Sequence, residues 1–245
     1  MAILARKRIA MQAIITGGTK GIGRAIAERL ARAGYDLILC SRSAEDLAET
    51  AKALLALRSD IKVDTTPCDM SQKDQVLAFG DFCLKTGGTM DVLINNAGVF
   101  IPGALLDEEE GALELMTETN LYSAYHLTRK IAPHMVSRQS GHIINMASIA
   151  SFMAYPNGGS YSISKFALRG FSKVLREELK DKGVKVTTIM PGATWSHSWA
   201  GMKGQLPESR LMQAEDIADT VWSLLTLGPS AVVEEVVLRP QLGDL

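Results

Sequence analysis

The sequence predicts an α/β fold, in which a doubly wound parallel sheet of about seven strands carries helices on both faces. Short apolar runs alternate with longer amphipathic segments along the 245 residues, as in β-α units joined by right-handed crossovers. The first apolar run, residues 12–16, leads directly into the glycine-rich stretch 17–23 and a helical segment that ends at Gly34. This order lets backbone N–H groups at a helix N-terminus hold a pyrophosphate. The alternative is an ordinary glycine turn between a strand and a helix.

Composition limits the partners and the compartment. The chain has 26 Lys and Arg against 27 Asp and Glu, with no polybasic cluster, so we expect no nucleic-acid partner. No apolar run is long enough to span a membrane, so we expect no membrane partner. Cys40, Cys68 and Cys83 lack metal-ligand spacing, which favours buried thiols in a reducing cytoplasm and no metal site.

One domain accounts for almost the whole chain. No repeat, low-complexity tract or linker interrupts it, and 47% hydrophobic residues suffice for one core. Residues 1–10 are expected to be an N-terminal extension, and residues 11–245 a single dinucleotide-binding domain.

The remaining elements follow from apolar periodicity and from turn residues. Further strands are expected at residues 36–40, 62–67, 92–94, 142–147, 183–190 and 232–238. Helices are expected at 43–57, 71–85 and 213–227, with one helix that carries Asn120 and runs to about 138, and one that carries Tyr161 and runs to about 182. The acidic run 107–110 is predicted to be a solvated helix N-terminus, where acidic side chains suit the helix dipole.

The strongest chemical signal is a tyrosine and a lysine four residues apart, Tyr161 and Lys165. On a helix this spacing puts both side chains on one face. A free phenol has a pKa near 10, and a neighbouring ammonium lowers it, which would make Tyr161 a usable acid or base. Ser148 ends the apolar run 142–147, so we expect its hydroxyl at the carboxyl end of a buried strand, where open α/β sheets bind ligands. A tyrosine and a lysine at this spacing also occur by chance in many helices.

Taken together, the motifs resemble the short-chain dehydrogenase/reductase family, in its compact branch with a Rossmann-type fold. The resemblance covers about residues 12–240 and keeps the family's order and approximate spacing. The motifs that carry it are Thr16-Gly17-x-x-x-Gly21-x-Gly23, Asp69, Asn95-Asn96-Ala97-Gly98, Asn120, Ser148, Tyr161-x-x-x-Lys165 and Pro191-Gly192.

The resemblance implies four catalytic residues. Tyr161 would donate the proton to a carbonyl oxygen as hydride arrives, and Ser148 would hydrogen-bond the developing alkoxide. Lys165 would lower the pKa of Tyr161 and bind the nicotinamide ribose. Asn120 would hold a water molecule in the proton relay.

The resemblance also implies the cofactor residues. Asp69 would bind adenine, and Ser196 would replace the threonine that usually contacts the carboxamide. The full set is Gly17, Thr19, Lys20, Gly21, Ile22, Gly23, Ser41, Arg42, Asp69, Asn96, Ala97, Gly98, Tyr161, Lys165, Pro191, Gly192, Thr194 and Ser196.

NADP is the expected cofactor because no carboxylate stands at the end of the second strand. An acidic residue there favours NAD by bonding the ribose hydroxyls and repelling a phosphate. Here Ser41 occupies that place, and the cations Arg42 and Lys20 can both reach a 2′-phosphate. The alternative is that these are two solvated surface cations.

The carboxyl end, residues 232–240 with the closing Gly243-Asp244-Leu245, is similar, more loosely, to bacterial sepiapterin-reductase-like members. A flat or diketone substrate would suit the candidate pocket residues Ser148, Trp195, Trp199, Met202 and Asp244. The sequence therefore predicts an NADPH-dependent carbonyl reductase acting on a small molecule. Two alternatives remain: a 3-oxoacyl-acyl-carrier-protein reductase, and a non-catalytic NADP-binding regulator. The family also implies a homodimer or homotetramer.

Overall fold

Seven parallel strands form one sheet in the computed structural model, which describes residues 11–195 and 210–244. The strands are arranged in the order β3-β2-β1-β4-β5-β6-β7, which confirms the predicted fold class. Their bounds are β1 Gln12–Thr16, β2 Asp36–Ser41, β3 Val63–Pro67, β4 Val92–Asn95, β5 Gly141–Met146, β6 Val184–Pro191 and β7 Glu235–Leu238. The expected extension, residues 1–10, lies outside the described residues.

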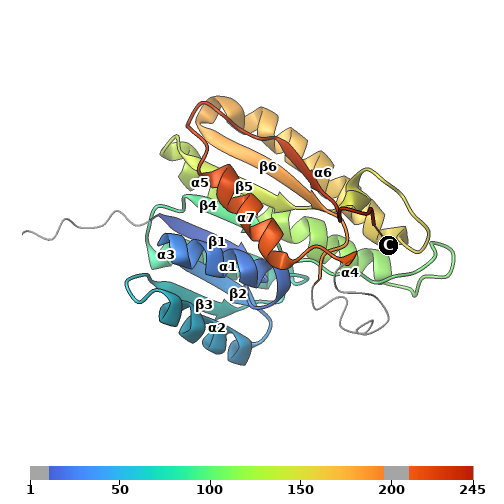
Figure 1. Cartoon of the computed structure of the whole chain (residues 1–245), viewed down its shortest axis with the longest axis horizontal. Helices are drawn as coiled ribbons and strands as arrows, with labels where there is room; N and C mark the ends of the chain where they lie inside the picture. Colours follow the sequence, from blue (N-terminus) through green and yellow to red (C-terminus); the bar gives the residue numbers. More distant parts are fainter. Residues whose placement is uncertain (1–10, 196–209, 245) are drawn as a thin grey trace, which may run out of the picture.

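Helices cover both faces of the sheet (Figure 1). They are α1 Gly21–Ala33, α2 Ala44–Leu57, α3 Lys73–Thr86, α4 Ala112–Thr117, α5 Ser123–Ser137, α6 Gly159–Leu179 and α7 Ala214–Leu225. Alternate residues of β1 point to opposite faces: Ala13 and Ile15 pack with α1, α2 and α7, whereas Ile14 packs with α3 and α5. All five residues of β1 are buried, as expected for a central strand of a parallel sheet covered on both sides.

The strand order reverses between β1 and β4. From β1 the chain builds outward through β2 to β3, and it then returns to β4 on the other side of β1. Ligands of open α/β sheets bind outside the carboxyl ends of the strands at such a reversal. The glycine-rich stretch 17–23 follows β1 and the segment 96–99 follows β4, so the topology brings these two motifs together.

Two predicted elements differ from the structure. The acidic run 107–110 is not a helix start: α4 begins only at Ala112, and Glu108 turns away to hydrogen-bond Ser160 at the start of α6. The single helix expected around Asn120 is divided into α4, a π-helical turn at Glu118–Tyr122, and α5. A π-turn adds a residue to the helix and re-aims its side chains, a feature common at functional sites. In the described part of the chain, no helix is long and apolar enough to cross a membrane.

Candidate active site

The glycine-rich turn leaves no room for side chains at its closest approaches. Gly17 and Gly21 have positive φ angles of 66° and 53°. A Cβ on Gly23 would lie 2.2 Å from the carbonyl oxygen of Gly17 and 2.5 Å from Nδ2 of Asn96. Thr19 belongs to the same turn, and Ile22 belongs to the first turn of α1. Gly23 therefore lets the start of α1 pack directly against the turn, whose backbone N–H groups at the helix N-terminus suit a bound pyrophosphate.

Thr16 and Asn96 join this turn to the end of β4. Oγ1 of Thr16 accepts hydrogen bonds from the backbone N–H groups of Asn96 (3.0 Å) and Ala97 (2.9 Å). Nδ2 of Asn96 donates to the carbonyl oxygens of Thr16 (2.9 Å) and Gly17 (3.2 Å). Sequence reasoning placed Asn96 and Ala97 beside the cofactor but gave Thr16 no role. Its position as the first residue of the glycine motif is the signal that could have found it.

The adenosine end is formed where the glycine turn meets β2. The N–H groups of Gly17 and Gly18 both donate to the carbonyl oxygen of Cys40, at 2.9 and 3.2 Å. Arg42, two residues further on, is exposed, and Ser41 bonds the carbonyl oxygen of Ser43. Arg42 and Lys20, the two residues predicted to contact the 2′-phosphate, therefore follow backbone segments that are hydrogen-bonded to each other.

Two predicted cofactor residues at this end have protein partners. Nζ of Lys20 forms an ion pair with Asp46 at 2.8 Å. Oδ1 of Asp69 accepts hydrogen bonds from the backbone N–H and the hydroxyl of Ser71, at 2.9 and 2.8 Å. Lys20 is thus paired with α2 while its side chain stays more than half exposed, and Asp69 is oriented by the turn that follows β3.

Asn120 is buried in the π-turn and holds the segment after β4 in place. Its Oδ1 accepts from the N–H of Val99 at 2.7 Å, and its Nδ2 donates to the carbonyl oxygen of Val99 and to Oγ of Ser164. A Cβ on Gly98 would lie 3.0 Å from Oδ1 of Asn120 and 3.4 Å from Nζ of Lys165. Gly98 thus keeps clear the space in front of Lys165 where the resemblance puts the nicotinamide ribose.

The structure brings Ser148, Tyr161 and Lys165 together as predicted from the sequence. Ser148 follows β5, and its hydroxyl lies close enough to that of Tyr161 to act on the pKa of the phenol. One turn along α6 from Tyr161, Lys165 is buried, and its Nζ lies 5.7 Å from the centroid of the Tyr161 ring. The same Nζ donates to the carbonyl oxygen of Met146 at 2.9 Å, so the ammonium is directed at the end of β5.

The proton affinities differ from the expectation based on the tyrosine–lysine pair. We expected Lys165 to lower the pKa of Tyr161; instead, packing of the protein around the phenol raises that pKa to about 12, while the hydrogen bond from Ser148 acts in the lowering direction. Burial also lowers the pKa of Lys165, to about 8, because the charged ammonium loses its water. Tyr161 therefore carries its proton throughout the neutral range, which is the form that a proton donor needs.

Sequence reasoning missed two aromatic neighbours of Tyr161. Phe100, from the segment after β4, packs edge-on against the Tyr161 ring, with centroids 4.8 Å apart. Tyr155, from the segment before α6, lies close enough to raise the pKa of Tyr161 further. Both are more than a third exposed, so Tyr161 has aromatic neighbours at the protein surface. Neither belongs to a motif, and only the folded chain identifies them.

The predicted substrate residues are partly visible. Beyond Pro191 and Gly192 at the end of β6, Thr194 is buried and Trp195 is half-buried. Asp244 contacts the same turn: its Oδ1 accepts from the N–H of Ala193 at 2.9 Å, and its Oδ2 accepts from Nε of Arg239 at 2.6 Å. Burial, and to a smaller extent the charge of Asp244, raise the pKa of Tyr155. The predicted residues Ser196, Trp199 and Met202 lie outside the described residues.

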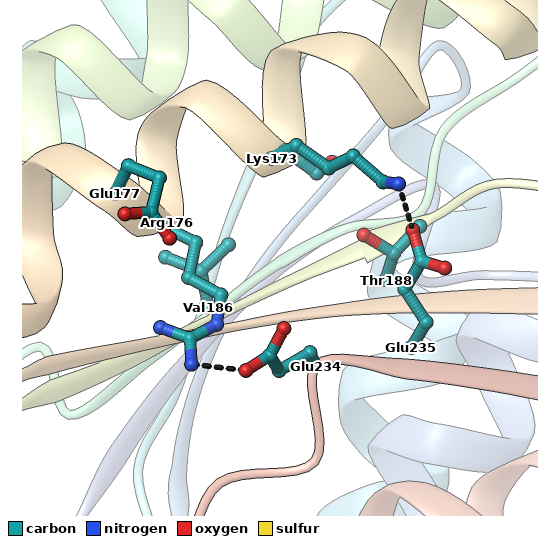
Figure 2. A pocket seen from close by; sticks show the side chains of 8 residues that line it. Lys173, Arg176, Glu177, Val186, Thr188, Glu234 and Glu235 are labelled. Atoms are coloured by element: carbon teal, nitrogen blue, oxygen red, sulfur yellow. Dashed lines mark hydrogen bonds and ion pairs between the residues drawn. The ribbon is translucent and has the colours of Figure 1, made fainter.

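A separate hollow of about 410 Å³ opens between α6 and the strands β6 and β7 (Figure 2). Arg176 forms an ion pair with Glu234, and Lys173 forms one with Glu235. Ser172, which also lines it, is 11 residues beyond Tyr161, or about 16 Å along a helix axis. This hollow is therefore distinct from the catalytic group. Among the described residues, no cluster of three or more His, Cys, Asp or Glu side chains could hold a metal ion.

A nucleotide cradle at a strand-order reversal, joined to a serine–tyrosine–lysine group, defines a dinucleotide-dependent oxidoreductase. Residues 11–205 match the family described as short chain dehydrogenase, and the chain belongs to that family. It is 35% identical to a sepiapterin reductase from Chlorobaculum tepidum over 240 residues, which cover 95% of this chain and 97% of the relative. It is also 34% identical to dehydrogenase/reductase SDR family member 7B from Bos taurus, over 73% of this chain and 56% of that protein.

Solved structures show the same likeness. An alcohol dehydrogenase from Thermococcus sibiricus, complexed with 5-hydroxy-NADP, superimposes with a TM-score of 0.88 at 29% identity, covering 96% of this chain and 99% of that one. Actinorhodin polyketide ketoreductase with NADPH gives a TM-score of 0.87 at 26% identity, over 96% and 98% of the two chains.

Proposed function

We propose that the protein is an NADPH-dependent carbonyl reductase that converts a ketone or aldehyde to an alcohol. The observation that carries the proposal is the convergence of three side chains: Ser148 after β5, Tyr161 on α6, and the buried Lys165, whose Nζ lies 5.7 Å from the centroid of the Tyr161 ring. The enzyme uses NADP, in agreement with neighbours of the same fold that were solved with NADP compounds. When bound, NADPH supplies the hydride. The glycine turn would hold its pyrophosphate, and Arg42 and Lys20 its 2′-phosphate.

The residues of this chain supply the proton and the orientation. The hydroxyl of Ser148 donates a hydrogen bond to the substrate carbonyl oxygen and polarises it. As the carbonyl carbon accepts the hydride, the Tyr161 O–H bond breaks and its proton goes to the oxygen, which becomes the alcohol. Lys165 stabilises the resulting phenolate by its charge, and Asn120 fixes the backbone of Val99 beside it.

A flat or diketone substrate is the preferred class. Phe100 and Tyr155 are aromatic neighbours of Tyr161 at the protein surface, and Trp195 lies on the loop after β6. Aromatic rings favour flat apolar substrates through stacking. The likeness to a sepiapterin reductase supports this class. A 3-oxoacyl thioester is the second candidate, and the observation in its favour is the likeness to a polyketide ketoreductase.

Assembly and location are also part of the proposal. We place the protein in the cytoplasm because its three cysteines are free and buried, as suits a reducing compartment. We expect a homodimer or homotetramer, supported by exposed apolar side chains on two neighbouring elements, Tyr122 and Tyr125 near the start of α5 and Ile163 and Phe166 on α6. Light scattering at micromolar concentration checks the assembly, and a monomer would contradict it.

The function is tested by following NADPH absorbance with three probes: sepiapterin, an aromatic α-diketone and an acetoacetyl thioester. Reduction of the first or second with the highest kcat/KM is the expected result. A preference for the thioester would favour the second candidate. NADPH binding without oxidation by any of the probes would favour the non-catalytic regulator.

A further inference from the structure

We propose that Glu108 is a positioning residue that fixes the start of the catalytic helix α6 and thereby the Tyr161 hydroxyl. This inference rests on the proposed role of Tyr161. Glu108 belongs to the segment between β4 and α4, some fifty residues before α6 in the sequence. One of its carboxylate oxygens accepts from the backbone N–H of Ser160 at 2.9 Å, and the other accepts from the Ser160 hydroxyl.

The first turn of α6 lacks a cap of its own. The N-cap residue is Gly158, which has no side chain, and no side-chain cap hydrogen bond is present at that position. The first N–H groups of a helix have no partner within the helix, and a side-chain oxygen normally satisfies one at the second or third position. Ser160 is the second residue of α6, so Glu108 supplies the missing cap from a distant segment. Its negative charge also suits the positive end of the helix dipole.

Two glycines make room for this carboxylate. A Cβ on Gly159 would lie 2.3 Å from Oε1 of Glu108, and a Cβ on Gly103 would lie 2.7 Å from its Cγ. Gly103 also forms a parallel bridge with Gly158, and its N–H donates to the carbonyl oxygen of Asn157 at 3.1 Å. The segment after β4 is therefore fastened to the start of α6 at both the backbone and the Glu108 carboxylate.

The segment after β4 also contacts Tyr161, the proposed proton donor, directly. Tyr161 follows Ser160, and Phe100 from the same segment packs against the Tyr161 ring at 4.8 Å. Asn120 holds Val99, immediately before Phe100. One segment thus contacts Tyr161 at its ring and at the helix turn that carries it. Small displacements of a catalytic group are enough to slow a reaction strongly.

The test compares Glu108→Ala with Glu108→Gln and with Glu110→Ala, a change in the same acidic run at an exposed residue. We expect Glu108→Ala to lower kcat for the best carbonyl probe about 10-fold or more, while the Kd for NADPH changes less than about twofold. Glu108→Gln keeps an acceptor for the Ser160 N–H and should recover much of kcat. Glu110→Ala should match the unmodified protein. In the protein without added cofactor, hydrogen exchange of the peptide around Ser160 should be faster in Glu108→Ala.

A second variant covers the case in which Glu108→Ala does not fold. The new Cβ of Gly103→Ala would lie 2.7 Å from Cγ of Glu108, so this change should displace the Glu108 side chain with no substitution in α6 and should lower kcat in the same way. Gly103→Ala combined with Glu108→Ala should be no worse than Glu108→Ala alone, because both changes act through one contact. Unchanged kcat in both single variants, with slow exchange at Ser160, would overturn the proposal. Tyr161→Phe is measured alongside: if it is inactive while the Glu108 variants are normal, only the role of Glu108 fails, and if Tyr161→Phe is active, the proposed function fails.

Discussion

The two sides of the site are built differently. On the cofactor side, the side chains of Thr16 and Asn96 bond backbone groups of the glycine turn and of the segment after β4, and Gly23 stands where a Cβ would collide. On the substrate side, Glu108, Phe100, Tyr155 and Asp244 come from segments without regular structure and meet through side chains. The residues of the first side belong to short motifs, Thr16-Gly17-x-x-x-Gly21-x-Gly23 and Asn95-Asn96-Ala97-Gly98, which can be found in the sequence. The four residues of the second side belong to no motif. Substitutions should therefore abolish cofactor binding on the first side and adjust turnover or KM on the second.

The largest effect on binding is expected from Gly23→Ala. The new Cβ would lie 2.2 Å from the Gly17 carbonyl oxygen, so the turn must move, and its N–H groups would no longer point at the pyrophosphate. A hydrogen bond to a charged group contributes roughly 1.5–3 kcal/mol, so losing two of them should raise the Kd for NADPH by at least about 100-fold. Fluorescence titration measures this. Gly170→Ala is the control, because its Cβ meets nothing within 4 Å; equal Kd values for the two variants would contradict the cradle.

Cofactor choice should respond to Arg42→Ala. The loss of one guanidinium contact to the 2′-phosphate should lower kcat/KM with NADPH by about 10-fold and leave the value with NADH nearly unchanged. Adding Lys20→Ala should remove most of the remaining preference for NADPH over NADH. The contribution of Lys20 is expected to be smaller than that of Arg42 because Lys20 is also paired with Asp46. Steady-state kinetics with both cofactors decides this, and equal or better kcat/KM of the unmodified protein with NADH would refute it.

The C-terminal segment should affect substrate binding. Asp244→Ala releases the Ala193 N–H and Arg239, and loosens the turn that follows β6. We expect KM for the carbonyl substrate to rise about fivefold, the equivalent of one hydrogen bond of ~1 kcal/mol. Leu242→Ala, at an exposed residue of the same segment, is the control. An unchanged KM for sepiapterin in Asp244→Ala would show that the C-terminal segment is not part of the substrate site.

His142 should affect stability alone. Burial and the charge of Lys185 lower its pKa to about 4, and Thr187, whose hydroxyl donates to Val233, accepts from the His142 ring nitrogen. The unfolded chain takes up a proton near pH 6.5 and the folded chain only near pH 4, so stability falls as pH falls through this window. The loss is at most about 3 kcal/mol. Urea unfolding at several pH values should show that the free energy of unfolding of His142→Gln depends less on pH than that of the unmodified protein, with unchanged turnover at neutral pH. An equal pH dependence in the two proteins would exclude His142 as the cause.

The sequence predicted the parts that local rules govern. The strand and helix order and the glycine turn follow from periodicity and spacing, and the fold class and the family are confirmed. The roles of the catalytic residues came from the resemblance to the family and stay a prediction. Glu108 was misinterpreted because an acidic run suits any helix N-terminus, and the helix it caps begins fifty residues later. The raised pKa of Tyr161 was missed because burial is a property of the folded surroundings. Phe100 and Tyr155 had no signal at all.

The central claim is that Tyr161 donates the proton to the substrate and that NADPH binding does not depend on the Tyr161 hydroxyl. Tyr161→Phe tests this claim most directly. NADPH binding and carbonyl reduction are measured on the same sample, by fluorescence titration and by absorbance. We predict an NADPH Kd within about twofold of the unmodified protein and a turnover at least ~100-fold lower, the scale of a lost general acid. Near-normal turnover in Tyr161→Phe would contradict the claim.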